Sequence, residues 1–355
     1  MPISDDIEIQ NSSDDDVVPY EYSITSYGAD YPVDGLVKRI NAGSIFIPHF
    51  QREFVWSQND SSKFVESLLL GLPVPGIFLS RESETQKLLV IDGQQRLRSL
   101  QYFYSGVFSP IKREFSLTGI KSKYEGKSYN TLSTEDRLRL DDSILHATII
   151  KQDEPSKDNS SVYHIFERLN TGGKLLKPQE IRACIYYGEF SKLLNSLNED
   201  RYWRDIFGNV NKFLRDQELI LRFLALFYEA ENYKRPMKLF LNKFMGKHRN
   251  LEYITAESMK QTFSNTIAVV HNDLVDLKPF RPERALNAAI FDAVMVGIAK
   301  RLQKGDITDR EELRRAYKVL MQNEKFIEAT RRATANEENV EERIRIANDE
   351  FAKVA

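Results

Sequence analysis

The chain has 355 residues, with 50 basic and 52 acidic side chains and a formal net charge of −2, which argues against a protein coated in basic charge but allows a local basic patch. Its one cysteine, Cys184, excludes an internal disulfide and a cysteine-based zinc site, and we expect it to be a small core residue. No run approaches the roughly 18 apolar residues of a membrane span, and no signal-peptide pattern is visible, so we expect a cytoplasmic protein without a membrane partner. Residues 1–19 are polar and acidic, which predicts a disordered tail.

Residues 20–155 carry apolar positions at both helical and strand spacing, which predicts a mixed domain. We expect helices at 31–42, 61–70 and 134–140, and strands at 45–47, 77–79, 87–91, 115–117 and 145–151. The strands at 77–79 and 88–91 are joined by a short polar stretch and are expected to be antiparallel. The helix at 61–70 is expected to be capped by Asn59 or Asp60.

The most informative stretch is the corner between the strand at 87–91 and the helix that follows it. Asp92 is a natural N-cap, and Gly93 permits a tight bend and the close approach of a ligand. The exposed N–H groups of a helix N-terminus attract anions, phosphates above all. Two amides and one guanidinium crowd the first turn: Gln94, Gln95 and Arg96. The alternative is an ordinary capped helix with solvated polar residues.

A second polar loop follows the short strand at 45–47 and contains Gln51, Arg52 and Trp56 between apolar neighbours. Polar residues on such a rigidly flanked loop are candidates for a binding site. The alternative is that Arg52 pairs with a structural carboxylate and that Trp56 belongs to the core.

Residues 156–355 are expected to form an all-helical domain without strands, with helices near 163–170, 212–228, 236–244, 256–274, 284–303 and 309–321. The turn Thr171-Gly172-Gly173-Lys174 could cradle phosphate with backbone N–H groups and a lysine counter-charge. It is not a P-loop, and the alternative is a helix-to-helix turn that needs glycine. Pro178 is expected at the first position of the next helix.

Several familiar active-site patterns are missing from the sequence. The five histidines are scattered singly, and no H-N-H nuclease, kinase, G-x-S-x-G or dinucleotide-binding signature is present. One basic run could contact nucleic-acid phosphates, although a solvated helix face is its more usual meaning. The candidate DNA-binding residues of this run are Lys234, Arg235, Lys238, Lys243, Lys247 and Arg249.

Three stretches of the sequence together indicate a family resemblance that none of them indicates alone, because they occur in a characteristic order. They are residues 47–56, residues 90–97, and residues 166–173 with 178–182. The chain resembles the DGQQR-motif family, typified by the GmrS half of GmrSD-type modification-dependent restriction systems. The resemblance implies a ParB/sulfiredoxin-like domain at 20–155, followed by the all-α domain at 156–355. It also implies binding and hydrolysis of a nucleoside triphosphate in defence against phage, recognition of modified DNA, and control of a nuclease. Since no H-N-H site follows in this chain, that nuclease is expected to be a separate subunit.

The chemistry of the residues agrees with a phosphate site at the corner. Arg96 is suited to bidentate phosphate binding, and Asp92 either caps the helix or holds Mg²⁺ among triphosphate oxygens. Gln94 or Gln95 could orient an attacking water, and Arg52 could add positive charge. The candidate catalytic residues are Asp92, Gln94, Gln95 and Arg96. The candidate nucleotide-binding residues are Gln51, Arg52, Gly93, Arg168, Asn170, Thr171, Gly172, Gly173 and Lys174.

Three functions remain open from the sequence. The first is a triphosphate-hydrolysing sensor that switches a separate nuclease, and the second is an adaptor that binds nucleotide or DNA without hydrolysis. The third, and least favoured, is a ParB-like nuclease, because the sequence shows no clustered metal site.

Overall fold

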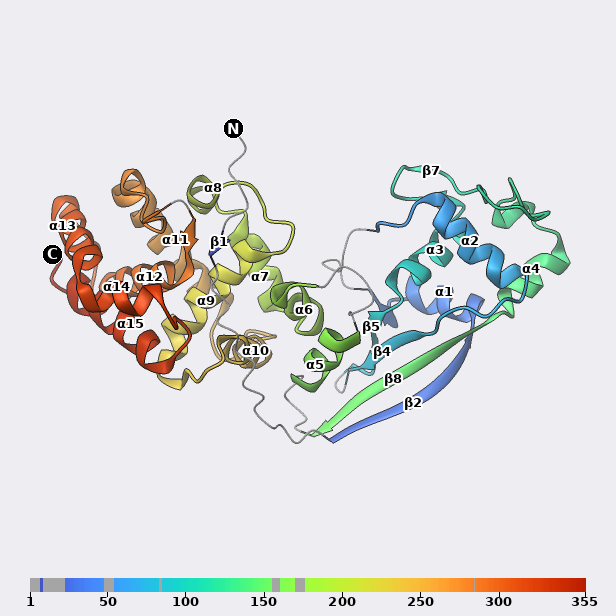
Figure 1. Ribbon diagram of the computed structural model, residues 1–355, viewed down its shortest axis with the longest axis horizontal. Coiled ribbons are helices and arrows are strands. Elements are labelled where there is room, and N and C mark those ends of the chain that lie inside the picture. The colour runs from blue at the N-terminus through green and yellow to red at the C-terminus, as the bar shows by residue number, and fades with distance from the viewer. Residues whose placement is uncertain are drawn as a thin grey trace. The chain divides into compact units, whose positions relative to one another are not determined.

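The computed structural model in Figure 1 describes residues 7–8, 23–47, 54–82, 85–154, 160–169, 176–283 and 285–355. The chain divides into two units. The mixed unit comprises residues 21–176 and 183–185, and the helical unit comprises residues 1–20, 177–182 and 186–355. A mixed α/β part followed by a mainly helical part confirms the predicted α+β class. Within the described ranges, no helix combines the length and apolar character that crossing a membrane requires.

A five-stranded mixed sheet with the order β2-β8-β4-β5-β3 forms the centre of the mixed unit (Figure 1). The antiparallel pairing of β4 with β5 was predicted and is confirmed. β8 pairs antiparallel with β2 and parallel with β4, and β5 pairs parallel with β3. The strands are β2 (Ser23–Pro32), β3 (Ile45–Phe46), β4 (Ile77–Arg81), β5 (Leu88–Asp92) and β8 (Ile144–Glu154).

The edge strand β2 has no counterpart in the sequence-based prediction. Its sequence, Ser-Ile-Thr-Ser-Tyr-Gly-Ala-Asp-Tyr-Pro, is mostly polar, and its side chains are largely exposed. Strand patterns read from sequence depend on one buried face, and this strand has no strongly buried face. Its partner β8 supplies the buried residues of the pair, among them Leu145, Ala147 and Ile149.

The helices of the mixed unit are α1 (Val33–Asn41), α2 (Gln58–Leu69), α3 (Gln94–Ser105), α4 (Thr134–Asp141) and α5 (Ser160–Leu169). A short 3₁₀ turn, η1 (Tyr129–Thr131), precedes α4. α1 and α4 agree with the prediction, and Ser133 caps α4. α2 starts earlier than predicted, and the predicted caps Asn59 and Asp60 were wrong. Ser57 is the cap, and the Asp60 carboxylate accepts from the Ser57 backbone in a capping box.

The predicted strand at 115–117 was also wrong. A small hairpin of β6 (Val107–Phe108) and β7 (Arg113–Glu114) ends just before it. Phe115 and Leu117 are nevertheless fully buried in the core beneath α2 and α3. A short apolar run indicates that a segment is buried, but it does not show that the segment is a strand, which explains the error.

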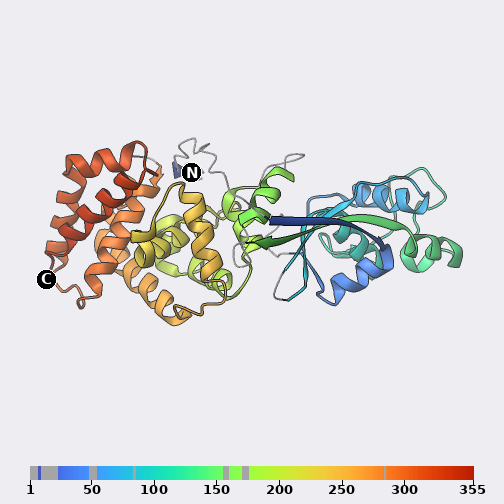
Figure 2. The same ribbon diagram turned by 90° about the horizontal axis from the view of Figure 1, so that it is seen from below.

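The helical unit contains the long helices predicted from apolar spacing, which Figure 2 shows from a second direction. The helices of this unit are α6 (Pro178–Ile185, whose last three residues group with the mixed unit), α7 (Glu189–Asn198), α8 (Arg201–Phe207), α9 (Arg215–Glu229), α10 (Met237–Lys247), α11 (Ala256–Val269), α12 (Ala288–Leu302), α13 (Arg310–Gln322), α14 (Glu324–Arg331) and α15 (Glu337–Phe351). α12 is the buried centre of the unit and contacts α9, α11, α14 and α15. The short turns are η3 (Ala230–Asn232), η4 (Val270–Leu274, a π-helical turn) and η5 (Val275–Leu277).

The expectation that this part contains no strand needs a correction. β9 (Leu286–Asn287) pairs in parallel with β1 (Ile7–Glu8), a two-residue strand within the segment that was expected to be a disordered tail. Two-residue strands carry no periodicity that a sequence pattern can reveal. The other residues of 1–19 lie outside the described residues. Cys184 is buried, as predicted.

Candidate functional site

The site predicted at the β5–α3 corner is built on a sharp backbone bend. β5 ends at Asp92, and Gly93 follows with φ of 102° and ψ of 9°, in the left-handed region. α3 starts at Gln94, as predicted, and Gly93 occupies its N-cap position. The prediction that Asp92 caps the helix was therefore wrong, because this residue is the last of the strand. The first N–H groups of α3 consequently have no side-chain cap.

Glycine is required at position 93 for two reasons. Few residues other than glycine adopt a positive φ without strain. In addition, a Cβ atom built on Gly93 would lie 2.4 Å from Cγ2 and 2.9 Å from Cβ of Ile77 on β4. The packing of β4 beneath the bend therefore fixes the position from which α3 begins.

Asp92 and Arg96 form an ion pair across the first turn of α3. The Arg96 Nη2 atom donates to Oδ2 of Asp92 at 2.5 Å. The Arg96 side chain is 15% exposed and that of Asp92 is 43% exposed, so the carboxylate faces solvent more than the guanidinium does. The buried Nε of Arg96 has no hydrogen-bond partner among the described residues. The structure thus brings together an acidic and a basic candidate at the start of one helix.

Gln95 has a role that the sequence did not reveal. Its Oε1 atom accepts hydrogen bonds from the backbone N–H groups of Val55, at 3.0 Å, and Trp56, at 3.2 Å. These contacts hold the end of the 47–56 stretch against the first turn of α3. Gln95 is therefore a positioning residue in this structure, and Gln94 beside it is likewise half-buried.

The loop that Gln95 holds is anchored by aromatic rings. The Phe54 ring packs edge-to-face on Tyr102 of α3, with centroids 5.1 Å apart. The Trp56 ring packs in the same manner on Phe64 of α2, at 5.8 Å, which agrees with the alternative that Trp56 belongs to the core. Gln51 and Arg52, two predicted nucleotide-binding residues of this stretch, lie outside the described residues.

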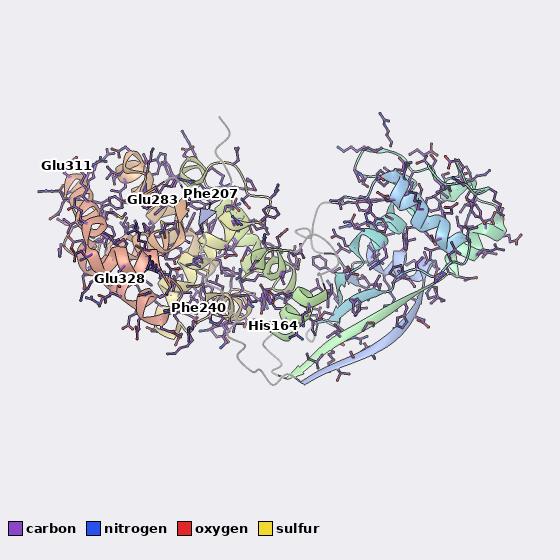
Figure 3. The ribbon with its side chains drawn as sticks, in the orientation of Figure 1. His164, Phe207, Phe240, Glu283, Glu311 and Glu328 are labelled. Carbon is purple, nitrogen blue, oxygen red and sulfur yellow. The ribbon has the colours of Figure 1, made fainter. Side chains whose placement is uncertain are left out.

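The third motif is divided between the described and undescribed parts of the chain. Arg168 is exposed on α5, a helix that contacts β5 and β8. His164 lies on the same helix (Figure 3), and its Nδ1 atom is 3.8 Å from the Glu167 carboxylate. The helix carrying Arg168 therefore packs on the strand that carries Asp92. The predicted residues Asn170, Thr171, Gly172, Gly173 and Lys174 lie outside the described residues.

The end of the third motif is a buried polar cluster in the helical unit. Pro178 is the first residue of α6, as predicted. Arg182 is 1% exposed and donates to Oε1 of Gln179, Oε2 of Glu218 and Oδ1 of Asn242. This cluster connects α6 to α9 and α10. Helical spacing alone could not show that Arg182 is buried, since arginine is usually exposed.

The basic run around α10 is largely engaged with acidic or carbonyl oxygens. Lys247 and the buried His248 share Oε1 of Glu229, at 2.7 and 3.1 Å. The backbone N–H of Arg235 donates to Glu337, and Nε of Arg249 donates to the carbonyl oxygen of Tyr187. Lys234, Lys238 and Lys243 belong to the same run, and Lys238 and Lys243 lie on α10 itself.

Burial and the neighbouring charges shift the pKa values of the Glu229 pair. Burial lowers the pKa of His248 below its ordinary value, against the opposing effect of Glu229. Burial would raise the pKa of Glu229, but hydrogen bonds from Lys247 and His248 lower it on balance. Among the described residues, no three His, Cys, Asp or Glu side chains gather as a metal site would require.

Comparison with known proteins places the corner within a recognised domain. Residues 33–187 match the family model described as the GmrSD restriction endonuclease N-terminal domain. An uncharacterized protein of Methanocaldococcus jannaschii is 32% identical over 99 residues, which cover 21% of this chain, and the chain spans 16% of that relative. No solved structure matches the chain, and the ParB/sulfiredoxin-like fold stays a prediction. Residues 33–187, which contain the β5–α3 corner, are therefore similar to the N-terminal domain of the GmrSD restriction endonuclease.

Proposed function

We propose that this protein binds and hydrolyses a nucleoside triphosphate, and that it serves as the sensor or regulatory subunit of a restriction-like anti-phage system with a separate nuclease. The Asp92–Arg96 pair at the uncapped N-terminus of α3, within a GmrSD-type domain, carries this proposal. Uncapped helix N–H groups and an arginine together form a favourable phosphate site.

In this proposal each residue of the corner has a separate task. The first N–H groups of α3 and the Arg96 guanidinium bind phosphate oxygens, and Gly93 lets the phosphate approach the backbone. The Asp92 carboxylate fits Mg²⁺, because it is accessible and Mg²⁺ usually combines one or two carboxylates with substrate phosphates. A bound Mg²⁺ would neutralise charge on the phosphates. Gln94 orients the attacking water, and Gln95 holds the 54–56 loop in place.

DNA and a nuclease enter the proposal through the family. The matching domain is named for a restriction endonuclease, whose substrate is DNA. We propose that DNA, in modified form, is the signal that alters triphosphate turnover. The basic residues near α10 are the candidate contact, and Lys243 on that helix is more suitable than Lys247, which is paired with Glu229.

Phosphate release tests the hydrolytic role directly. The purified protein is assayed with ATP, GTP, CTP and UTP, with and without phage DNA, beside Arg96→Ala and the control Arg98→Ala. Arg98 lies on the same helix, and among the described residues its side chain donates to Gln101, away from the corner. We expect turnover with at least one nucleotide, loss of turnover in Arg96→Ala, and retention in Arg98→Ala. Equal turnover in both variants would refute the assignment of the corner.

The second candidate is an adaptor that binds nucleotide without hydrolysing it. The engagement of Gln95 by two backbone N–H groups favours it, because this glutamine then has a structural task in place of a catalytic one. Nucleotide binding that depends on Arg96, without phosphate release under any of these conditions, would select the adaptor.

A further inference from the structure

The two charged residues of the β5–α3 corner neutralise each other in the structure. The Asp92 carboxylate occupies Nη2 of Arg96 at 2.5 Å, so that part of the guanidinium is not available to another anion. The two side chains lie one helical turn apart, and the bend at Gly93 fixes their separation through its packing on Ile77. Any anion that binds at this corner therefore meets a carboxylate as well as a guanidinium.

We propose that Asp92 determines the ligand specificity of this corner, by admitting metal-bound polyphosphate and rejecting the free polyphosphate anion. The inference rests on the proposed function and adds that the corner discriminates against the metal-free anion. A free polyphosphate must compete with Asp92 for Arg96 and must also bind beside a negative charge, and both effects weaken its binding.

A polyphosphate that carries a divalent cation meets the opposite situation. The cation attracts the Asp92 carboxylate, whose 43% exposure leaves it accessible to a ligand. The carboxylate then exchanges Arg96 for the cation, and the guanidinium exchanges the carboxylate for a phosphate oxygen. Each charge keeps an opposite partner throughout, so the exchange leaves no charge unpaired in a half-buried position.

The orphaned Nε of Arg96 supports this exchange. The atom is buried and makes no hydrogen bond among the described residues, while Nη2 is bound to Asp92. Arginine binds phosphate best through two parallel N–H groups. The Arg96 guanidinium therefore keeps donor capacity beyond the single carboxylate oxygen that it now holds, and a phosphate that displaces Asp92 could use this capacity once the side chain turns.

Binding of inorganic tripolyphosphate tests the inference without depending on hydrolysis. Isothermal titration calorimetry on the full chain compares wild type and Asp92→Asn, each with excess Mg²⁺ and with a chelator. We expect the wild-type protein to prefer the Mg²⁺ complex by about tenfold or more, and Asp92→Asn to bind the metal-free anion at least about tenfold more tightly than wild type does. The variant should also lose the preference for Mg²⁺.

Two further variants make the test specific. Asp92→Glu keeps the charge and should retain the preference for the Mg²⁺ complex. Asp34 lies in the first turn of α1 and forms a similar pair with Lys38, four residues further along the helix. Asp34→Asn removes this carboxylate and should change neither affinity. Thermal denaturation in the same buffers confirms that each variant is folded.

The outcomes separate this inference from the proposed function. If tripolyphosphate binds but Asp92→Asn leaves metal-free binding unchanged or weaker, the selective role of Asp92 is refuted and the phosphate site stands. If folded wild-type and Asp92→Asn proteins bind no tripolyphosphate with or without Mg²⁺, both the inference and the phosphate site are refuted.

Discussion

Replacing Gly93 with alanine should disrupt the corner on which the proposed site depends. The added Cβ would lie 2.4 Å from Cγ2 of Ile77, and the residue would have to keep a φ of 102°. A left-handed conformation costs an alanine about 1–2 kcal/mol, and overpacking in a filled core adds about 1–3 kcal/mol. We therefore expect the free energy of unfolding to fall by about 2–5 kcal/mol.

Gly106→Ala is the matched control, because this glycine ends the same helix with φ of 74°, and a Cβ atom built on it would meet no described heavy atom within 4 Å. It should cost only the conformational part, about 1–2 kcal/mol. Urea unfolding followed by circular dichroism measures both variants. If Gly93→Ala is no more destabilised than Gly106→Ala, the steric argument at Ile77 is wrong.

Three other changes test separate parts of the structure. Gln95→Ala removes two hydrogen bonds, so it should lower the free energy of unfolding by about 1 kcal/mol and speed amide hydrogen exchange at Val55 and Trp56. The control Gln101→Ala should leave the exchange rates of these two amides unchanged. Asp292→Asn leaves the buried Arg222 and Arg343 without their shared carboxylate and should cost about 3–5 kcal/mol in urea unfolding. The exposed pair of Asp349 with Arg345 is the control, and Asp349→Asn should change stability little. Burial lowers the pKa of His248, so the stability that this residue contributes is present above its ordinary pKa of 6.5 and is lost as the pH falls below that value. The thermal midpoint of the wild-type protein should therefore fall on acidification, and it should fall less steeply in His248→Gln. Equal slopes in the two proteins would contradict the assignment.

The sequence predicted the parts of the fold that repeat a pattern over several residues. The four apolar positions of α1 are all buried, and β4 and β5 pair antiparallel as expected. The position of Gly93 between β5 and α3 also followed from the sequence, because its neighbours change there from strand to helical spacing.

Contacts between distant residues could not be predicted in this way. The bond from Gln95 to the 54–56 loop joins two motifs that have no periodic relation to each other. Asp92 was predicted as a cap because aspartate favours that position, but the bend placed glycine there and turned the carboxylate toward Arg96. Arg182 is buried because three partners from other positions surround it, and only the tertiary structure brings them together.

The pairing of β2 with β8 has a consequence for how the mixed unit is made. β2 is complete once residue 32 has been synthesised, but every strand residue that it pairs with lies between 144 and 154. During synthesis from the N-terminus, β2 therefore cannot form its hydrogen bonds until most of the mixed unit, including β8, has been synthesised. Such non-local strand pairing slows folding. The family match begins at residue 33 and so omits β2. A fragment expressed from that residue would expose the long edge of β8 to pairing with other chains, and aggregation of such a fragment would reflect a missing strand rather than an unstable core.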